Sequence, residues 1–330
     1  MSAAPGAQSS WDDRPIVGID LGGTKIRSVV TRAAGTILGE DVRPTEADHG
    51  ARVVVDRLAA SARAAVAASG IALDEVIAVG VTAPGTVDFD AGVLHQPPNL
   101  PGWDAVPLGK LLGERLGRAV FVENDANAAA YGEWRYGAGV GLRHMIYITV
   151  STGIGAGLIL NGQLYRGADG AAGELGHATI DVHGPPHNCG MIGCLEVMAS
   201  GTAIARMAHE AVTANRSPRL AELQREHDEL TAVEVDLAAD EGDPAAVEIL
   251  ARASEYLGVG LANYINIFNP EAIVVGGGVT RIGRQLLEPA FRLAKARAFR
   301  LPSERVQLLT AALEGRAEVL GVSALARDSV

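Results

Sequence analysis

The sequence has 330 residues, of which 48% are hydrophobic and 20% are charged, so its composition is that of a globular protein and not of a disordered or fibrous chain. The formal net charge is −11, and aromatic residues make up only 4% of the chain. An interface for nucleic acid needs a surplus of Lys and Arg, and single strands also need aromatic stacking platforms. The composition therefore excludes an extended nucleic-acid surface but allows a local site for a small phosphorylated ligand.

The amino-terminal segment and the cysteine content are typical of a cytoplasmic protein. Residues 1–14 are expected to form a flexible tail, and they lack the basic start and apolar centre of a secretion signal. No apolar run reaches the ~18 residues that a membrane helix needs. The two cysteines, Cys189 and Cys194, cannot build a disulfide scaffold and suit a reducing compartment. We therefore expect a soluble cytoplasmic protein without a membrane partner.

Strands and helices alternate in the first part of the chain. Residues 15–40 are predicted to form a β-meander, in which glycine turns join three apolar strands. A helix is predicted over 51–69 because apolar residues recur four apart on one of its faces. The elements that follow are a buried strand at 76–82, a short helix at 107–117, a buried strand at 119–125 and a helix at 126–136.

The second part of the chain repeats the plan of the first. Residues 144–167 again contain an apolar strand, a Gly/Thr-rich turn, a second strand, a short glycine turn and a third strand. The later elements are helices at 196–214 and 243–266, a strand at 271–275, a helix at 280–298, a strand at 305–310 and a helix at 314–327. This pattern predicts an α/β protein of two similar halves with mixed sheets, and ligands usually bind in the cleft between such halves.

The first glycine turn has the residues of a phosphate site. DLGGTK, residues 20–25, joins two strands, and its glycines expose backbone N–H groups to which phosphate oxygens can bind. Asp20 can hold Mg²⁺, while Thr24 and Lys25 can reach phosphate oxygens. The alternative is an ordinary tight hairpin, which the spacing alone slightly favours because the segment is not a GxxxxGK[ST] loop.

Two further glycine segments lie in the second half. STGIGAG, residues 151–157, is the equivalent of the first turn, and two such turns facing each other could grip a polyphosphate from both sides. Gly276–Gly278 lies between a strand and a helix, where bare backbone could admit a base or a ribose. The alternative for this triplet is a tight connection without a ligand.

ENDAN, residues 123–127, ends a buried strand at the expected cleft. Asp125 at the end of this strand can accept a proton or orient a hydroxyl group. The alternative is that Asn124 or Asp125 caps the following helix. Both roles can coexist, with one residue as the cap and the other in the cleft.

GELGH, residues 173–177, and HNCGMIGCLE, residues 187–196, contain the donors of a metal site. Cys189 and Cys194 have C-x₄-C spacing around two glycines, at the edge of the usual range for metal-binding pairs. Two histidines would complete a tetrahedral zinc site, and His183 competes for one of these places. The alternative is a pair of reduced thiols with unrelated surface histidines.

The ordered series of motifs resembles the ROK family of sugar kinases, in particular its bacterial glucokinase branch. The resemblance runs from Ile16 to about Ala326 and rests on DLGGTK, APG (83–85), NLPGW (99–103), ENDAN, STGIGAG, GELGH, CGMIGCLE and IVVGGG. It implies a duplicated, actin-like (ribonuclease H-like) α/β fold with an interdomain cleft for ATP and sugar. The expected domains are a smaller one of 15–122 plus 312–330 and a larger one of 123–311 that carries the zinc loop.

The resemblance also implies a role for individual residues. Asp125 is expected to be the catalytic base and to contact the sugar. The expected sugar ligands are Asn99, Asn124, Glu174, His177 and Glu196. The expected ATP and Mg²⁺ contacts are Asp20, Gly22, Gly23, Thr24, Lys25, Thr152, Gly153, Gly276, Gly277 and Gly278. The expected ligands of a structural zinc ion are His177, His187, Cys189 and Cys194. Here the chain departs from the family, which usually has three Cys and one His, because His187 stands where the first Cys is expected.

The implied activity is ATP-dependent phosphorylation of a hexose at its 6-hydroxyl, with glucose as the expected substrate and a homodimer as the expected assembly. A different hexose (fructose, mannose, N-acetylmannosamine or N-acetylglucosamine) and polyphosphate as the donor stay open as alternatives. A sugar-responsive repressor is a further alternative. It is disfavoured because repressors of the family carry a helix-turn-helix domain before the first glycine motif, where about fifteen residues stand here. An intact Asp125 disfavours a catalytically inactive sugar sensor.

Overall fold

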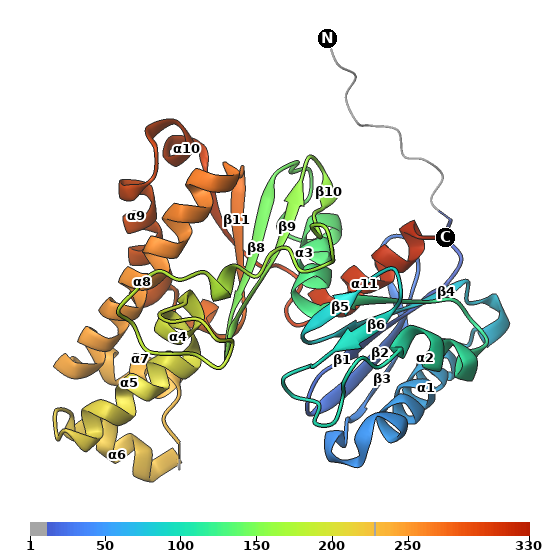
Figure 1. The fold of residues 1–330 in the computed structure, drawn as a ribbon, viewed down its shortest axis with the longest axis horizontal. Coiled ribbons are helices and arrows are strands. Elements are labelled where there is room, and N and C mark those ends of the chain that lie inside the picture. The colour runs from blue at the N-terminus through green and yellow to red at the C-terminus, as the bar shows by residue number, and fades with distance from the viewer. Residues whose placement is uncertain (1–11, 228) are drawn as a thin grey trace. The chain divides into compact units, whose positions relative to one another are not determined.

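The computed structural model of the protein describes residues 12–227 and 229–330, so most of the expected tail of residues 1–14 lies outside the described residues. The chain forms two compact units, each with its own core (Figure 1). The first unit comprises the described residues up to Gly137, together with Arg166–Ala171 and Leu313–Val330, and the second comprises Ala138–Tyr165 and Ala172–Ala312.

The first unit contains a five-stranded sheet in the order β3-β2-β1-β4-β7. Its strands are β1 (Ile16–Leu21), β2 (Lys25–Thr31), β3 (Ile37–Pro44), β4 (Ala78–Ala83) and β7 (Val120–Asn124). β2 pairs antiparallel with both β1 and β3, whereas β4 pairs parallel with both β1 and β7. All residues of β4 are buried, as expected for a strand that has neighbours on both sides and helices on both faces.

The second unit contains a sheet of the same plan, in the order β10-β9-β8-β11-β12. Its strands are β8 (Met145–Val150), β9 (Ile154–Leu160), β10 (Gln163–Leu164), β11 (Ala272–Gly276) and β12 (Gln307–Thr310). The directions also match, because β9 is antiparallel to β8 and β10 while β11 is parallel to β8 and β12. The predicted duplication of a mixed sheet is therefore confirmed.

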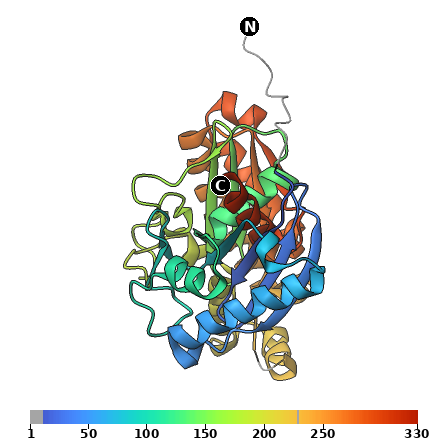
Figure 2. The same ribbon diagram turned by 90° about the vertical axis from the view of Figure 1, so that its right-hand side faces the viewer.

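Helices cover both faces of the first sheet (Figures 1 and 2). The elements of this unit outside the sheet are η1 (Ala47–His49), α1 (Gly50–Ser69), η2 (Leu73–Glu75), the hairpin β5 (Thr86–Asp88) and β6 (Val93–His95), α2 (Leu108–Leu116), α3 (Asp125–Tyr136) and α11 (Ala317–Asp328). The predicted apolar face of α1, which includes Val54 and Leu58, is fully buried and packs with β1 and β2. The opposite face is covered by α11, whose Ser323 and Val322 lie against Gly18 of β1 and Gly80 of β4.

Small residues bring α3 and α11 into close contact. A Cβ atom on Gly132 of α3 would lie 2.2 Å from the carbonyl oxygen of Ala317, and one on Gly321 of α11 would lie 1.8 Å from that of Ala128. Only hydrogen at these positions lets the two helix backbones approach so closely. This packing places α3 in the first compact unit, which also includes Arg166–Ala171, while Ala312 lies in the second unit. The compact units therefore differ from the expected domains at residues 123–137, 166–171 and 312.

Helices dominate the rest of the second unit. Its elements are η3 (Leu175–His177), α4 (Leu195–Ala199), α5 (Gly201–Thr213), α6 (Pro218–His227), α7 (Ala232–Asp240), α8 (Pro244–Phe268), η4 (Gly278–Ile282), η5 (Gly283–Leu287), α9 (Glu288–Arg297) and α10 (Arg300–Arg305). The predicted helix over 196–214 breaks because the Ser200 hydroxyl accepts a hydrogen bond from the backbone N–H of Ala203 and so caps a new helix. Among the described residues, no helix is long and apolar enough to cross a membrane.

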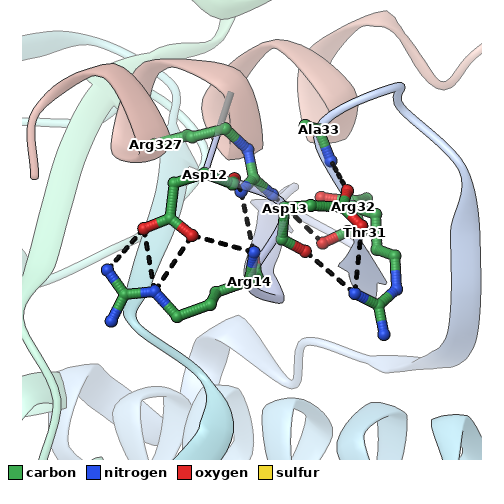
Figure 3. Close-up of polar contacts among 7 residues, drawn as sticks. All are labelled: Asp12, Asp13, Arg14, Thr31, Arg32, Ala33 and Arg327. Atoms are coloured by element: carbon green, nitrogen blue, oxygen red, sulfur yellow. Dashed lines mark hydrogen bonds and ion pairs between the residues drawn. The ribbon is translucent and has the colours of Figure 1, made fainter. Parts of the chain in front are cut away.

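The first described residues are attached to the last helix by Arg327 (Figure 3). Its guanidinium donates to the backbone carbonyl oxygens of Asp12 and Arg14, the second at 2.7 Å, and to that of Thr31 in β2. Burial lowers the pKa of Arg327, and three carbonyl acceptors offset part of that desolvation. Strand β1 therefore begins from an anchored backbone.

Candidate functional site

The carboxyl ends of the parallel strands of the first unit bring several predicted residues together. Asp20 lies near the end of β1, and its Oδ1 accepts a hydrogen bond of 2.8 Å from the hydroxyl of Thr82 in the neighbouring β4. Burial raises the pKa of the Asp20 carboxyl, while Thr82, Lys25 and Arg27 act in the opposite direction. A carboxylate that has lost water in this way gains from a bound cation, so Asp20 fits its predicted role toward Mg²⁺.

Asn124 and Asp125 lie at the equivalent end of β7. The Oδ1 atom of Asn124 accepts a hydrogen bond of 3.1 Å from the N–H of Asn127 and so caps α3, and its Nδ2 donates to the carbonyl oxygen of Gly85 at 3.1 Å. Asp125 is the first residue of α3, and its Oδ1 accepts the N–H of Ala126 at 2.8 Å. The cap is therefore Asn124, and Asp125 lies at the positive end of the helix dipole.

An ion pair between a buried carboxylate and a half-buried arginine lies next to these residues, and the sequence did not predict it. Glu123 is only 3% exposed, and its Oε1 accepts hydrogen bonds of 3.1 Å from the N–H of Asn124 and from Nδ2 of Asn127. Its Oε2 accepts a 2.7 Å bond from Nε of Arg166, whose guanidinium lies 4.1 Å from the centre of the Phe89 ring. No local pattern marks this pair, because its members are 43 residues apart in the chain.

The DLGGTK turn is a tight hairpin that also contacts a predicted sugar ligand. The N–H of Gly22 donates to the carbonyl oxygen of Lys25 at 3.0 Å, and Thr24 and Lys25 are exposed. A Cβ on Gly23 would lie 2.8 Å from Cβ of Asn99, so only glycine admits Asn99 there. The hairpin alternative thus describes the local geometry, and it leaves the two side chains after the glycines accessible to a ligand.

A second carboxylate, that of the half-buried Glu318, was also missed and interacts electrostatically with Asp20. Burial raises the pKa of Glu318 at the start of α11, and the negative charges of Asp20 and Glu133 raise it further. Glu133 itself is fully buried, and its Oε1 accepts the N–H of Leu313 at 2.8 Å. The sequence pattern does not predict the environment of the Glu318 carboxyl, because that environment depends on how α11 packs on the sheet.

The second unit presents the matching glycine turn between β8 and β9. Two hydrogen bonds from α5 fix the backbone of this turn. The N–H of Gly201 donates to the carbonyl oxygen of Ser151 at 2.7 Å, and the hydroxyl of Thr202 donates to the carbonyl oxygen of Thr152 at 2.8 Å. A Cβ on Gly153 would lie 2.4 Å from Oε2 of Glu196. The turn is therefore a fixed element with an exposed Thr152.

Close packing requires glycine at two positions of the Gly276–Gly278 triplet. Gly277 has φ of +88°, and a Cβ there would lie 2.3 Å from the carbonyl oxygen of Val150 at the end of β8. A Cβ on Gly276 would lie 2.4 Å from the hydroxyl of Tyr147, whereas Gly278 has more room. Of the two interpretations, the tight connection is what this geometry supports, and the nucleotide contact stays a prediction.

The structure gathers the four predicted metal ligands of the second unit. One donor atom from each lies within 4.8 Å of the others, and the four residues are His177, His187, Cys189 and Cys194. The Nδ1 atom of His187 lies 3.0 Å from Sγ of Cys189 and 3.4 Å from Sγ of Cys194. His183, the competing candidate, is outside this group of described residues.

The donor chemistry of this group fits a zinc ion. Nδ1 of His177 is buried and has no hydrogen-bond partner in the described part of the chain. Burial raises the pKa of the Cys194 thiol, which a cation would lower by binding the thiolate. The set of two nitrogens and two sulfurs suits tetrahedral zinc. The alternative, in which the histidines are unrelated to the thiols, is wrong because all four donor atoms lie close together.

The short helix η3 carries Glu174 and His177 at its two ends. The hydroxyl of the buried Tyr264 in α8 donates to the carbonyl oxygen of Leu175, and a Cβ on Gly176 would lie 2.0 Å from the carbonyl oxygen of Ile154. These contacts fix η3 against β9 and α8. Oε2 of Glu174 lies 3.7 Å from Nε2 of His177, so the predicted sugar ligand and the metal ligand are neighbours.

We predict that Glu318→Gln stabilises the protein at neutral pH. Because the pKa of Glu318 in the folded state is raised above the ordinary value of 4.5, the folded protein binds this proton more tightly, and stability falls as pH rises through that window. The variant cannot ionise, so its melting temperature should exceed that of the wild type at pH 8 and converge with it toward pH 4.5. Calorimetry without nucleotide or Mg²⁺ measures this.

The exposed Glu114→Gln in α2 is the matched control and should leave the melting temperature unchanged at every pH. A lower melting temperature for Glu318→Gln at pH 8 would show that the ionised carboxylate stabilises the fold instead.

Comparison with known proteins bears on the family and the fold of the chain. A family model described as "ROK family" matches residues 16–329. The glucokinase of Halalkalibacterium halodurans is 38% identical over 310 residues, which are 94% of this chain and 94% of that protein. A crystal structure of a ROK family glucokinase from Streptomyces griseus in complex with glucose and AMPPNP has a TM-score of 0.80 and 36% identity, and the match covers 95% of this chain and 99% of that one.

The xylose repressor of Bacillus subtilis is 31% identical over an alignment of 332 positions, which covers 97% of this chain and 82% of that protein. The likeness thus includes both enzymes and regulators. The duplicated sheets are those of the actin-like fold that the resemblance implies. Since the family model spans nearly all of the chain and the glucokinase matches most of it, the protein belongs to the ROK family.

Proposed function

We propose that the protein transfers the γ-phosphoryl group of ATP to the 6-hydroxyl of a hexose, with glucose as the preferred acceptor. The observation that carries the proposal is the set of polar groups at the carboxyl ends of β1, β4 and β7, where Asp20 and Asp125 lie, in a chain that matches a glucokinase over 94% of its length. Ligands of open α/β sheets bind at this edge.

Asp125 is the proposed general base. The cap of α3 is Asn124, so the carboxylate of Asp125 is not required for capping and is held in place by the N–H of Ala126. It would orient the 6-hydroxyl and accept its proton as the phosphoryl group is transferred. Glu123 and Arg166 support this segment from the buried side.

The glycine turns and Asp20 would hold the nucleotide. The backbone N–H groups of Gly23 and of Thr152–Gly153 would face phosphate oxygens, and Asp20 would bind Mg²⁺ directly or through water. When bound, Mg²⁺ neutralises phosphate charge. Phosphoryl transfer needs mainly positioning and neutralisation, which these groups can provide.

Sugar hydroxyls are the proposed partners of amide, carboxylate and imidazole groups. The proposed ligands are Asn99, Asn124, Asp125, Glu174, His177 and Glu196. A site built to hydrogen-bond hydroxyls rejects analogues that lack them, because its own polar groups are then left unpaired. A cytoplasmic homodimer stays a prediction.

A panel of acceptors and donors tests the function. We expect ATP to phosphorylate glucose with a higher kcat/KM than fructose, mannose, N-acetylmannosamine or N-acetylglucosamine, and polyphosphate to be a poor donor. Formation of the sugar phosphate is measured directly. A higher kcat/KM for another hexose would reassign the substrate, and sugar binding without turnover under any donor would favour the regulatory role of the B. subtilis relative.

We predict that Asp125→Asn lowers kcat by roughly 10²–10⁴-fold while glucose binding and melting temperature stay close to those of the wild type. Asparagine keeps the size of the side chain and its hydrogen bond to the N–H of Ala126, but it cannot take a proton. Calorimetric glucose binding, thermal melting and steady-state kinetics measure the three quantities.

Asp243→Asn is the matched control, since Asp243 also lies at a helix start and accepts the N–H of Ala246 at 2.9 Å. It should leave kcat unchanged. A near-normal kcat for Asp125→Asn would end the assignment of Asp125 as the base.

We propose that the metal group holds one structural zinc ion per chain. Zinc would cross-link the loop 187–194 to η3 and so stabilise the segment that carries Glu174. Cys194→Ser and His187→Ala should each lose zinc in elemental analysis and lower the melting temperature, whereas His183→Ala should keep both. Active, unchelated protein without zinc would contradict the proposal.

A further inference from the structure

Glu196 has two partners that belong to different parts of the second unit. It lies in α4, two residues after Cys194, and its side chain is 20% exposed. Its Oε2 accepts a hydrogen bond of 2.6 Å from the N–H of Ile154, the first residue of β9. Its Oε1 lies 3.3 Å from Nε2 of His187. One carboxylate therefore joins the metal loop to the strand that leaves the Ser151–Gly153 turn.

The orientation of His187 decides what it offers to Glu196. Its Nδ1 faces the sulfur atoms of Cys189 and Cys194, so Nε2 is the atom that faces Glu196. When Nδ1 binds a cation, the proton of the neutral ring is on Nε2 and is donated to Oε1. Carboxylates in this second position orient a metal-binding imidazole and increase its basicity.

The Glu196 carboxylate also packs tightly against the Ser151–Gly153 turn. Gly153 leaves room for the carboxylate, because a Cβ there would lie 2.4 Å from Oε2. The next helix, α5, also holds the turn, through Gly201 and Thr202. A shift of the metal loop must therefore move Glu196, and a shift of Glu196 must move the N–H of Ile154.

We propose that Glu196 is a positioning residue that couples the metal loop to the Ser151–Gly153 turn, so that zinc at the loop strengthens nucleotide binding. The inference rests on the proposed function, which assigns nucleotide phosphates to this turn, and it adds to the sugar contact proposed for Glu196. His187 makes the link possible, because its second ring nitrogen can donate a hydrogen bond while the first binds the metal. A cysteine that binds the metal through its sulfur has no N–H in its side chain to donate. Coupling between two sites is reciprocal, so bound nucleotide must also increase the affinity for zinc, and we expect that gain to appear as a slower loss of zinc.

Sugar-free holoprotein tests the coupling with two measurements, which are calorimetric titration with MgAMPPNP and the rate of zinc transfer to a coloured chelator. In the wild type, saturating MgAMPPNP should slow zinc transfer. Glu196→Gln replaces one carboxylate oxygen by an NH₂ group, which cannot accept from the N–H of Ile154 or from Nε2 of His187. The variant should speed zinc transfer and weaken MgAMPPNP binding, each by about 10-fold. MgAMPPNP should then no longer protect the zinc.

His187→Cys separates metal binding from the link, because it keeps a zinc ligand and removes the N–H. It should retain one zinc per chain and weaken MgAMPPNP binding, and Glu196→Gln added to it should cause little further change. This non-additivity is what a direct pair produces. Glu210→Gln in α5 is the control, since it removes an exposed carboxylate that pairs with Arg206 on the helix that holds the turn. It should leave MgAMPPNP affinity within about twofold of the wild type, because the change lies away from both the metal group and the turn.

Gly153→Ala tests the same link from the turn, at a residue that is not itself one of the metal ligands. Its added Cβ should displace Glu196 and speed zinc transfer even without nucleotide. Unchanged zinc transfer and MgAMPPNP affinity in Glu196→Gln, or zinc-free wild type that binds MgAMPPNP as tightly as holoprotein, would overturn the coupling while the kinase proposal stands. Wild-type holoprotein that binds no MgAMPPNP would overturn the kinase proposal, and the coupling with it.

Discussion

Parallel pairing of β1, β4 and β7 is the constraint on which the first unit depends. It brings three strand ends to one edge of the sheet, and the residues there come from positions 20, 82 and 124, far apart in the chain. The Asp20–Thr82 hydrogen bond and the helix start at Asn124 both follow from that pairing. The same strand order recurs in the second unit, where the ends of β8 and β11 meet at Val150 and Gly277.

Close contacts within the protein account for many glycines of the motifs. Gly277 faces the carbonyl of Val150, Gly176 faces that of Ile154, and Gly153 faces the carboxylate of Glu196. Each would clash with a Cβ in the protein alone, before any nucleotide or sugar is considered. A motif of this kind therefore records the packing of the site as well as its chemistry. The groups free to act on a ligand are the side chains that this packing leaves at the surface of the turns.

The order of strands and turns was predictable because apolar runs and glycine turns are local signals. The helices of the second unit were less predictable from the sequence. Ser200 splits one predicted helix by capping the next, and α6 has few apolar residues to mark it. The helix α7 had a usable signal in the capping box of Thr231 and Glu234. The metal ligands were predicted from their residue types and from the family resemblance. Glu123–Arg166 and Glu318 could not be found, since tertiary packing alone makes them neighbours.

The anchoring of α11 has a consequence for the synthesis of the protein. A ribosome releases the chain from its amino terminus, so β1–β4 and α3 emerge long before Ala317–Asp328. Until that helix appears, the face of the sheet at Gly18 and Gly80 and the groove of α3 at Gly132 lack their covering, and Arg327 is not there to hold the residues before β1. The second unit, whose segments are complete by Ala312, can form its core first. The nascent first unit thus passes through a stage with exposed apolar strands, during which a chaperone has a surface to bind.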